Sequence, residues 1–456
     1  MTSRSKMFSF FKNRLNMKQK KLNGKNSDWN LPKITNSAID ANYYRMEPHP
    51  MDYLIRDMIV TSCEDGTKML SLWGRGLTEI PNIIFAYREI GFLNLQENYI
   101  THIPLDLINL KKLRVLNLGC NNIQIIPKHI SQMQHLVRLN LSKNELGQLP
   151  SEISRLKQLK ELFLGGNQLQ NLPIEVSELT KLTNLDLSNN KFQEISHGVL
   201  KLTELRRLNL GYNEIQEINS EIKNLKMMNK LDLHHNAIFT LPSEIGDLKL
   251  LTFLNLRVNY LTMLPDVIGE MTNLVSIDVS GNCLLALPMQ IQHCKRLCKI
   301  TLSDNFLTEM PQGLLNVQNL EELYLDNNLI SGLNPNVTQL TSLKVLNLRK
   351  NYIRTLSKEI KGAMNLEKLD LSENDLDEFP GFISKLPKLN LLRVTNNNIE
   401  NIPESIVKRE QIVLYADNNR YRTIKKSTTK NGHITWENIV DMNSDETSSK
   451  SSNSKD

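Results

Sequence analysis

Aliphatic residues recur along the chain at fixed distances from an asparagine. Residues 231–246, LDLHHNAIFTLPSEIG, contain part of one copy of the frame L-x-x-L-x-L-x-x-N-x-L-x-x-L-P-x-x-I-x-x-L, which recurs every 23 residues. In its L-x-L part, buried and exposed positions alternate, which predicts a strand with the leucines inward and the residues between them outward. Each copy therefore predicts one short strand.

The frame repeats without insertion or deletion over fourteen copies. The asparagines that mark these copies are Asn98, Asn121, Asn144, Asn167, Asn190, Asn213, Asn236, Asn259, Asn282, Asn305, Asn328, Asn351, Asn374 and Asn397. One step earlier the position is Arg75, and one step later the frame slips by one residue to Asn419. We predict about sixteen turns, with atypical outer turns because no neighbour covers their outer side.

Two positions suggest how each turn leaves its strand. The asparagine amide can both donate and accept, so it can satisfy backbone groups that are buried between turns. In most copies a proline follows six residues later, and its fixed φ favours an extended entry to the convex side over a long helix. Three residues further, copies from Ile84 to Ile406 have Ile, Leu or Val, a second buried row. The next core position is Arg409 in the last full copy, where the array is expected to end.

These elements predict an α/β fold, a right-handed solenoid over residues 69–424. Stacked turns would form one continuous parallel sheet on the concave face of a horseshoe. Fifteen strand spacings of ~4.8 Å would give an arc of roughly 70 Å, enough to wrap a folded partner.

The 23-residue frame with its asparagine ladder is that of the leucine-rich repeat. Its LPxxIxxL variant resembles the intracellular Ras-group class of leucine-rich repeat proteins. The signalling members of that class are scaffolds for Ras-type GTPases and a protein phosphatase. The resemblance therefore implies a protein partner, with a Ras-type small GTPase or a phosphatase as the specific expectation.

Both flanks of the array differ from it in composition. We predict a basic, disordered tail over residues 1–46, a capping segment over 47–68, and a polar, serine-rich, disordered tail over 425–456. The capping segment has apolar residues at helical spacing, Leu54, Ile55, Met58 and Ile59.

Residues 1–27 hold eight Lys or Arg and no acidic residue, with Phe8, Phe10 and Phe11 between them. Such a stretch could contact an anionic membrane weakly, act as a targeting segment or form a docking motif. A solubilising tail is the simpler interpretation.

Charge and cysteine content narrow the class of protein. Residues 69–424 hold 38 Lys or Arg and 37 Asp or Glu, and this balance argues against a nucleic-acid groove. The five cysteines are odd in number and scattered, and no secretory signal is recognised. We therefore expect a cytoplasmic protein in a reducing compartment.

No sequence motif indicates catalysis, a cofactor or a metal. The chain has no glycine-rich phosphate loop, HExxH motif or nucleophile elbow. Cys294 takes a convex core position, so a zinc site in HCKRLC is not expected. Asp232, His234 and His235 resemble a site, but the residues 23 positions away on either side are not zinc ligands, and no nucleophile stands beside the histidines. We predict no catalytic, cofactor or metal residues.

The concave face is the expected binding surface. Its exposed aromatics and cations are residue types that anchor protein interfaces. The predicted contacts are Phe163, Arg206, Arg207, Tyr212, Lys230, Asp232, His234, His235, Phe253, Arg257 and Tyr324. Of these, Arg206, Arg207, Lys230, His234, His235 and Arg257 form a basic centre, and Asp304, Glu321, Glu322 and Asp326 an acidic segment farther along.

Two features of this surface leave alternatives open. The Asn and Asp residues between the paired strand leucines could serve only to keep the sheet soluble. The two histidines could make partner binding depend on pH near neutrality.

Two functional hypotheses follow from the sequence. The first is a non-enzymatic scaffold or adaptor that binds a protein on its concave face, in Ras-type GTPase or phosphatase signalling. The alternative is a structural or membrane-targeting protein that acts through its basic N-terminus, with the solenoid as a spacer.

Overall fold

A computed structural model of the chain describes residues 58–61, 66–409 and 411–420. The chain divides into two units, Met1–Val60 and Thr61–Asp456, and the second contains the repeats. Most of the predicted N-terminal tail and capping segment, including residues 1–27, Leu54 and Ile55, lies outside the described residues, as does the tail over 425–456. Val60–Thr61 form a short strand, β1, directly after the residues with predicted helical spacing.

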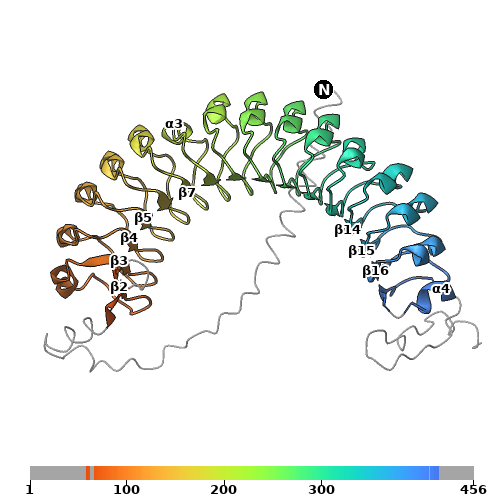
Figure 1. Cartoon of the computed structure of the whole chain (residues 1–456), viewed down its shortest axis with the longest axis horizontal. Coiled ribbons are helices and arrows are strands. Elements are labelled where there is room, and N and C mark those ends of the chain that lie inside the picture. Colours follow the sequence, from red (N-terminus) through yellow and green to blue (C-terminus); the bar gives the residue numbers. More distant parts are fainter. Residues whose placement is uncertain (1–57, 62–65, 410, 421–456) are drawn as a thin grey trace, which may run out of the picture. The chain divides into compact units, whose positions relative to one another are not determined.

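Within the second unit, sixteen strands from β2 to β17 form one parallel sheet in sequence order. The strands are β2 (Lys68–Ser71), β3 (Ile90–Asn94), β4 (Val115–Asn117), β5 (Arg138–Asn140), β6 (Glu161–Phe163), β7 (Asn184–Asp186), β8 (Arg207–Asn209), β9 (Lys230–Asp232), β10 (Phe253–Asn255), β11 (Ser276–Asp278), β12 (Lys299–Thr301), β13 (Glu322–Tyr324), β14 (Val345–Asn347), β15 (Lys368–Asp370), β16 (Leu391–Arg393) and β17 (Val413–Tyr415). The strands line the inner side of an arc (Figure 1), so the predicted horseshoe is confirmed.

The strand register follows the sequence period. Leu231 in β9 pairs with Leu254 in β10, a separation of 23 residues, whereas Leu392 pairs with Leu414 at the last step, where the frame slips. In β9 the central leucine is buried and the residues beside it are at least partly exposed. The alternation predicted from L-x-L is therefore present.

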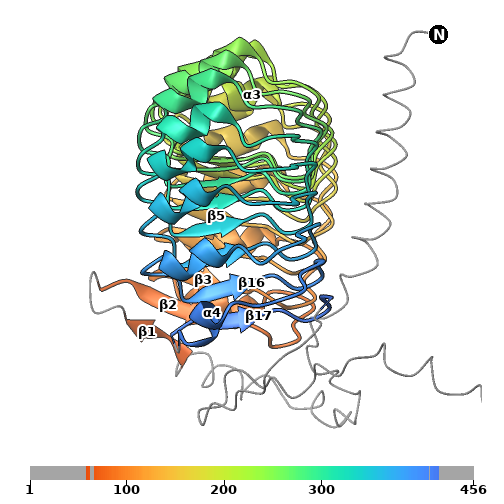
Figure 2. The ribbon, with the colours of Figure 1, turned by 90° about the vertical axis from the view of Figure 1, so that its right-hand side faces the viewer.

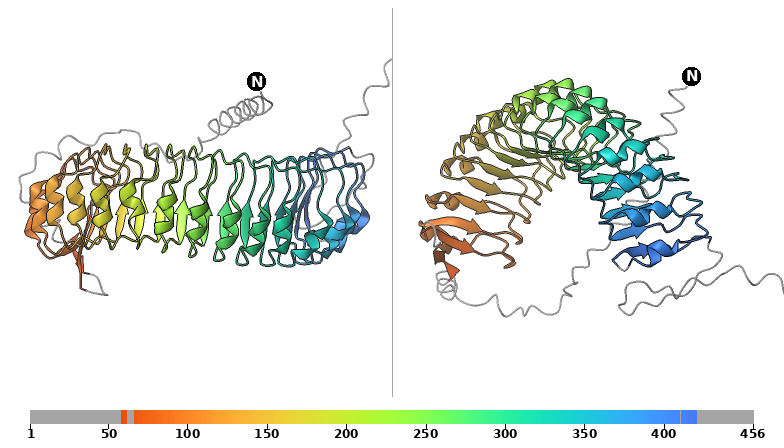
Figure 3. Two further views of the ribbon diagram at one scale, coloured as in Figure 1. Left: turned by 90° about the horizontal axis from the view of Figure 1, so that it is seen from above. Right: turned by 45° about the vertical axis from the view of Figure 1, so that its right-hand side comes forward.

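Short helical turns occupy the outer side of the arc, as Figures 2 and 3 show from the side and from above. Thirteen of them are five-residue 3₁₀ helices: η2 (Asn82–Ala86), η3 (Leu105–Asn109), η4 (Lys128–Gln132), η5 (Ser151–Arg155), η6 (Ile174–Glu178), η7 (Ser220–Asn224), η8 (Ser243–Asp247), η9 (Asp266–Glu270), η10 (Met289–His293), η11 (Gln312–Asn316), η12 (Pro335–Gln339), η13 (Lys358–Gly362) and η14 (Gly381–Lys385). The other two, α3 (His197–Leu200) and α4 (Glu404–Val407), are single α-helical turns.

Proline starts most of these turns in an extended conformation, as Pro242 does with φ −70° and ψ 156°. Asn219 and Asn334 replace this proline in two turns, and each side chain accepts a hydrogen bond from the backbone N–H two residues later. Both the proline and the capping asparagine favour the start of a short helical turn.

The core consists of the aliphatic rows that the frame predicts. Leu231, Leu233 and the convex Ile245 are fully buried, and equivalent residues continue along the array. At the C-terminal end, Arg409 Nη1 donates to Ser384 O at 2.9 Å and Leu386 O at 2.6 Å. The Arg409 guanidinium thus satisfies backbone carbonyls at the position where the row of buried aliphatic side chains ends. No helix in the described part of the chain is long and apolar enough to span a membrane.

Candidate functional site

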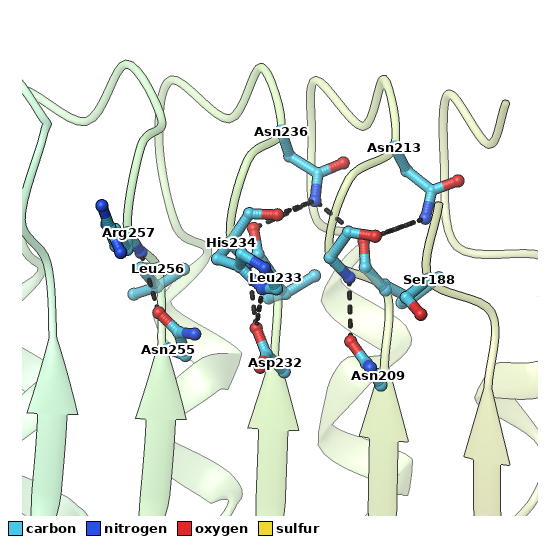
Figure 4. A network of polar contacts seen from close by, with 12 residues as sticks. Ser188, Asn209, Asn213, Asp232, Leu233, His234, Asn236, Asn255, Leu256 and Arg257 are labelled. Carbon is cyan, nitrogen blue, oxygen red and sulfur yellow. Dashed lines mark hydrogen bonds and ion pairs between the residues drawn. The ribbon is translucent and has the colours of Figure 1, made fainter. Parts of the chain in front are cut away.

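The asparagine ladder fixes where each strand ends and its loop begins. Asn236 Nδ2 donates to Leu210 O at 2.9 Å and to Leu233 O at 3.0 Å, and its Oδ1 accepts from Ile215 N at 3.0 Å. Figure 4 shows this amide above the strands. One side chain therefore bonds backbone groups of its own turn and of the preceding turn, which holds β8 and β9 and the side chains on them in fixed relation.

A second polar column lies on the concave face at the end of most strands. Asp232 Oδ1 accepts a hydrogen bond from His234 N at 3.1 Å, and Asn209 and Asn255 accept in the same way from residues 211 and 257 (Figure 4). The Asn and Asp residues between the strand leucines thus close a local turn in addition to facing solvent.

His234 and His235 form a ring cluster with Tyr212 on the preceding turn. The rings of Tyr212 and His235 are stacked, with centroids 4.3 Å apart and 12° between planes. His234 meets Tyr212 edge-on at 4.8 Å, and its Nδ1 lies 2.5 Å from Asp232 Oδ1. These contacts hold both imidazoles on the concave face in a defined orientation.

The neighbouring glycine makes room for this cluster. A Cβ on Gly211 would lie 2.3 Å from both Cε1 and Nδ1 of His234. The imidazole therefore occupies space that any side chain at position 211 would fill.

The surroundings of His235 determine its protonation state. Burial lowers the pKa of His235 to about 4, with further lowering from His234 and Arg257. His235 is therefore neutral near pH 7. The expectation that it titrates near neutrality is wrong for this residue.

The cations of the basic centre have no acidic partners among the described residues. Arg206, Arg207, Lys230 and Arg257 are all exposed, and none forms an ion pair within the described part of the chain. They lie on or directly beside the consecutive strands β8, β9 and β10. A cluster of positive charge thus faces solvent around the ring cluster.

The other predicted aromatics are arranged differently. Phe253 begins β10 and stands in register with Lys230 of β9, so it lies beside the basic centre. Phe163 lies two strands before β8 and under the Arg138 guanidinium at 5.0 Å, whereas Tyr324 lies three strands beyond β10 with Lys299 at 5.1 Å from its ring. Phe163 and Tyr324 are therefore separate from the cluster at β8–β10.

The acidic segment is largely compensated within the solenoid. Glu321 forms an ion pair with Lys344 at 2.9 Å, and Glu322 forms one with Lys299 at 2.8 Å. Burial raises the pKa of Asp326, whose Oδ1 accepts from Ser303 at 2.6 Å. The concave face thus carries uncompensated charge at β8–β10 and paired charge around β13.

The described residues offer little for metal or thiol chemistry. No group of three or more His, Cys, Asp and Glu in that part of the chain could hold a metal ion. Cys294 is fully buried, its Sγ lies 3.2 Å from Ile268 O, and burial raises its pKa to about 11. This thiol packs in the core as a small apolar side chain.

Our sequence analysis missed a second surface. The loops between the ladder asparagines and the convex turns carry exposed Phe239, Met263 and Leu285, and we call this side of the solenoid the loop edge. The frame has polar residues at these positions in most turns, for example Gln170, Gln193 and Gln216. Large apolar residues at these normally polar positions could have indicated the loop edge from the sequence.

Comparisons with protein families identify the repeats. The model described as "Leucine-rich repeat region" matches residues 184–277, "Leucine rich repeat" matches 92–146, 111–169 and 318–376, and "Leucine Rich repeats (2 copies)" matches 157–202. No curated protein matches the chain.

Solved structures with the same architecture come from several sources. An LRR protein of Leptospira interrogans is 36% identical, with a TM-score of 0.75, and the match covers 77% of this chain and 90% of that chain. A TDR receptor is 28% identical over 77% of this chain and 64% of that chain, with a TM-score of 0.67. The plant peptide hormone receptor RGFR1 in complex with RGF2 is 25% identical over 77% of this chain and 67% of that chain, with a TM-score of 0.59.

Proposed function

Because the chain belongs to the leucine-rich repeat family, we propose that it is a non-enzymatic scaffold whose concave face captures an acidic surface of a partner protein. Proteins of this family generally act in protein–protein interaction. The proposed contacts centre on β8, β9 and β10, where Arg206, Arg207 and Arg257 surround the ring cluster.

One observation carries the proposal: the cations at β8–β10 form no ion pair with any acidic residue that the structure describes. Several exposed cations elsewhere on the sheet, Arg138, Lys299 and Arg393, pair with a carboxylate of a neighbouring turn, whereas four unpaired cations lie together at β8–β10. Charge left unpaired on a rigid surface favours association with an opposite charge. Tyr212, which is 49% exposed, and the histidine rings supply the aromatic area that interface centres use.

The specific partner we propose is a Ras-type small GTPase or a protein phosphatase. Support comes from the LPxxIxxL frame, which resembles the Ras-group class of signalling scaffolds. We also propose that the protein works in the cytoplasm, because Cys120, Cys294 and Cys298 form no disulfide among the described residues.

A charge-reversal variant tests the proposal. We expect Arg206→Glu, Arg207→Glu and Arg257→Glu together to reduce partner recovery about tenfold or more, since arginine is enriched among the few interface residues whose loss costs about 2 kcal/mol or more. The measurement is quantitative affinity purification from the native cell, with the thermal unfolding transition recorded in parallel.

The matched control reverses three exposed cations on the helical side, Arg155, Lys201 and Lys226. It should retain the partner. Equal recovery by both triple variants would show that the basic centre is not the site. Loss of a protein other than a GTPase or phosphatase would keep the concave site and reject the specific partner.

A further inference from the structure

The loop edge joins a polar hollow to an apolar patch. The hollow spans three consecutive turns and is lined by amide and charged side chains. These residues are Gln170, Asn171, Lys191, Gln193, Glu194, Glu214, Gln216 and Glu217. Three carboxylates face one lysine there, so the hollow has a net negative charge.

The carboxylates of the hollow are available to a ligand. Glu194, Glu214 and Glu217 are exposed, and none forms an ion pair with another residue that the structure describes. Other acidic residues, such as Glu178 and Glu270, pair with lysines of a neighbouring turn. The net charge of the hollow is thus opposite in sign to that of the basic centre, and the hollow lies on a different side of the solenoid.

The apolar patch occupies the next three turns. Phe239 is 43% exposed and stacks on Tyr260, with ring centroids 5.4 Å apart. Met263 and Leu285 are 64% and 48% exposed. Large apolar side chains that are exposed on successive turns of a surface commonly mark an interaction site.

Backbone hydrogen bonds connect the two features. Gln216 N donates to Gln193 O at 3.3 Å, and Phe239 N donates to Gln216 O at 3.4 Å. The chain therefore passes from the hollow to the apolar patch through adjacent, bonded loops. A single ligand lying along the loop edge would contact both.

We propose that this loop edge binds an extended segment of a partner protein in which Lys or Arg residues lie next to large apolar residues. The cations would enter the hollow at Glu194, Glu214 and Glu217. The apolar side chains would cover Phe239, Met263 and Leu285.

The length of the segment follows from the turn spacing. From the turn of Glu194 to that of Leu285 is four steps, roughly 19 Å at ~4.8 Å per strand spacing, which about six extended residues span at ~3.3 Å each. An anionic lipid surface fits less well because the carboxylates would repel it. This partner is independent of the concave one, so the protein would hold two proteins at once.

The test selects ligands by their chemistry. A phage-displayed library of random twelve-residue peptides is panned against the full chain, and the most enriched peptide is measured by fluorescence anisotropy. We expect enrichment of peptides with adjacent basic and large apolar residues, and binding that weakens several-fold as salt is raised. No enrichment of this class overturns the proposal.

Two sets of substitutions locate the binding. Glu194→Gln, Glu214→Gln and Glu217→Gln together should weaken peptide binding at least tenfold, as should Phe239→Ser, Met263→Ser and Leu285→Ser together. These side chains are exposed, so the thermal transition should stay unchanged.

A matched control removes three exposed apolar residues from the helical side. These are Leu105, Ile174 and Met289, each replaced by Ser. The control and the concave variant Arg206→Glu/Arg207→Glu/Arg257→Glu should bind the peptide within twofold of wild type, which separates this inference from the proposed function. Unchanged peptide affinity in both loop-edge variants overturns the inference, as does binding to phosphatidylserine vesicles that depends on Phe239 and Met263.

Discussion

Asp232 illustrates what a single side chain does on the concave face. The alternation of the frame predicted that it points outward. Its hydrogen bond from His234 N was not predicted, because exposed polar residues look alike in a sequence. The bond forms because the backbone turns back sharply just beyond the strand, where His235 has a φ of 51°.

His235 gives a prediction about pH and stability. Its pKa is lowered from 6.5 to about 4, chiefly by burial. Between these values the unfolded chain binds a proton that the folded protein does not, so stability falls as pH falls from about 6.5 to about 4. His235→Asn should make this loss smaller, as measured by urea unfolding at pH 7, 5.5 and 4.5.

Asparagine is the suitable replacement because it tolerates a positive φ. Asn189, Asn327 and Asn396 have φ values of 51–54° at the same position in other turns. The exposed His135, replaced by Asn, is the control and should leave the pH profile unchanged. Identical pH profiles for His235→Asn and wild type would contradict the proposed contribution of the half-buried imidazole.

At the scale of elements, the sequence predicted the strands better than the helical turns. Leucine spacing fixed each strand to within a residue, whereas proline indicated only an extended entry with no long helix. Five residues separate the proline from the next core leucine, as in η8 (Ser243–Asp247) between Pro242 and Leu248, which leaves room for only a single short helical turn.

Glycines within these turns show how closely they pack. In η9 (Asp266–Glu270), a Cβ on Gly269 would lie 2.3 Å from Gln290 O on the next turn. We expect Gly269→Ala to destabilise the protein by about 1–3 kcal/mol, because the backbone must move apart. The measurement is the midpoint of urea unfolding.

Gly381 is the matched control, since it also lies in a 3₁₀ helix, η14 (Gly381–Lys385). A Cβ there would meet only Pro403 Cγ at 3.7 Å. Gly381→Ala should be neutral or stabilise by up to about 1 kcal/mol, because alanine restricts the unfolded chain. Destabilisation of both variants by the same amount would mean that close packing of the turns is not the cause.

At the scale of the whole molecule, the period predicted the number and order of the strands. The same period also indicates which side chains on neighbouring turns form ion pairs. Lys299 and Glu322 are 23 residues apart, so their pairing across turns was readable. Our sequence analysis grouped the acidic residues by their order in the chain, so it did not predict this ion pair. The orientation of the Tyr212, His234 and His235 rings depends on side-chain packing, which no period specifies.

Stacked turns make the effect of a defect depend on its place in the array. Asn282 and Asn98 each donate to at least two backbone carbonyls and accept from a backbone N–H of the preceding turn. Asn→Leu at either position leaves these groups unpaired, at a cost of about 2–4 kcal/mol. Because turns contact only their neighbours, Asn282→Leu should speed hydrogen exchange on both sides of the centre, whereas Asn98→Leu should affect only the first turns.

Hydrogen exchange monitored by mass spectrometry measures this spread of opening along the chain. Asn171→Leu, which replaces an exposed asparagine, is the control and should leave exchange in the core unchanged. If Asn98→Leu accelerated exchange uniformly from the first turn to the last, the array would unfold as one cooperative body. The nearest-neighbour description of its stability would then be wrong, and the concave and loop-edge surfaces would be energetically coupled.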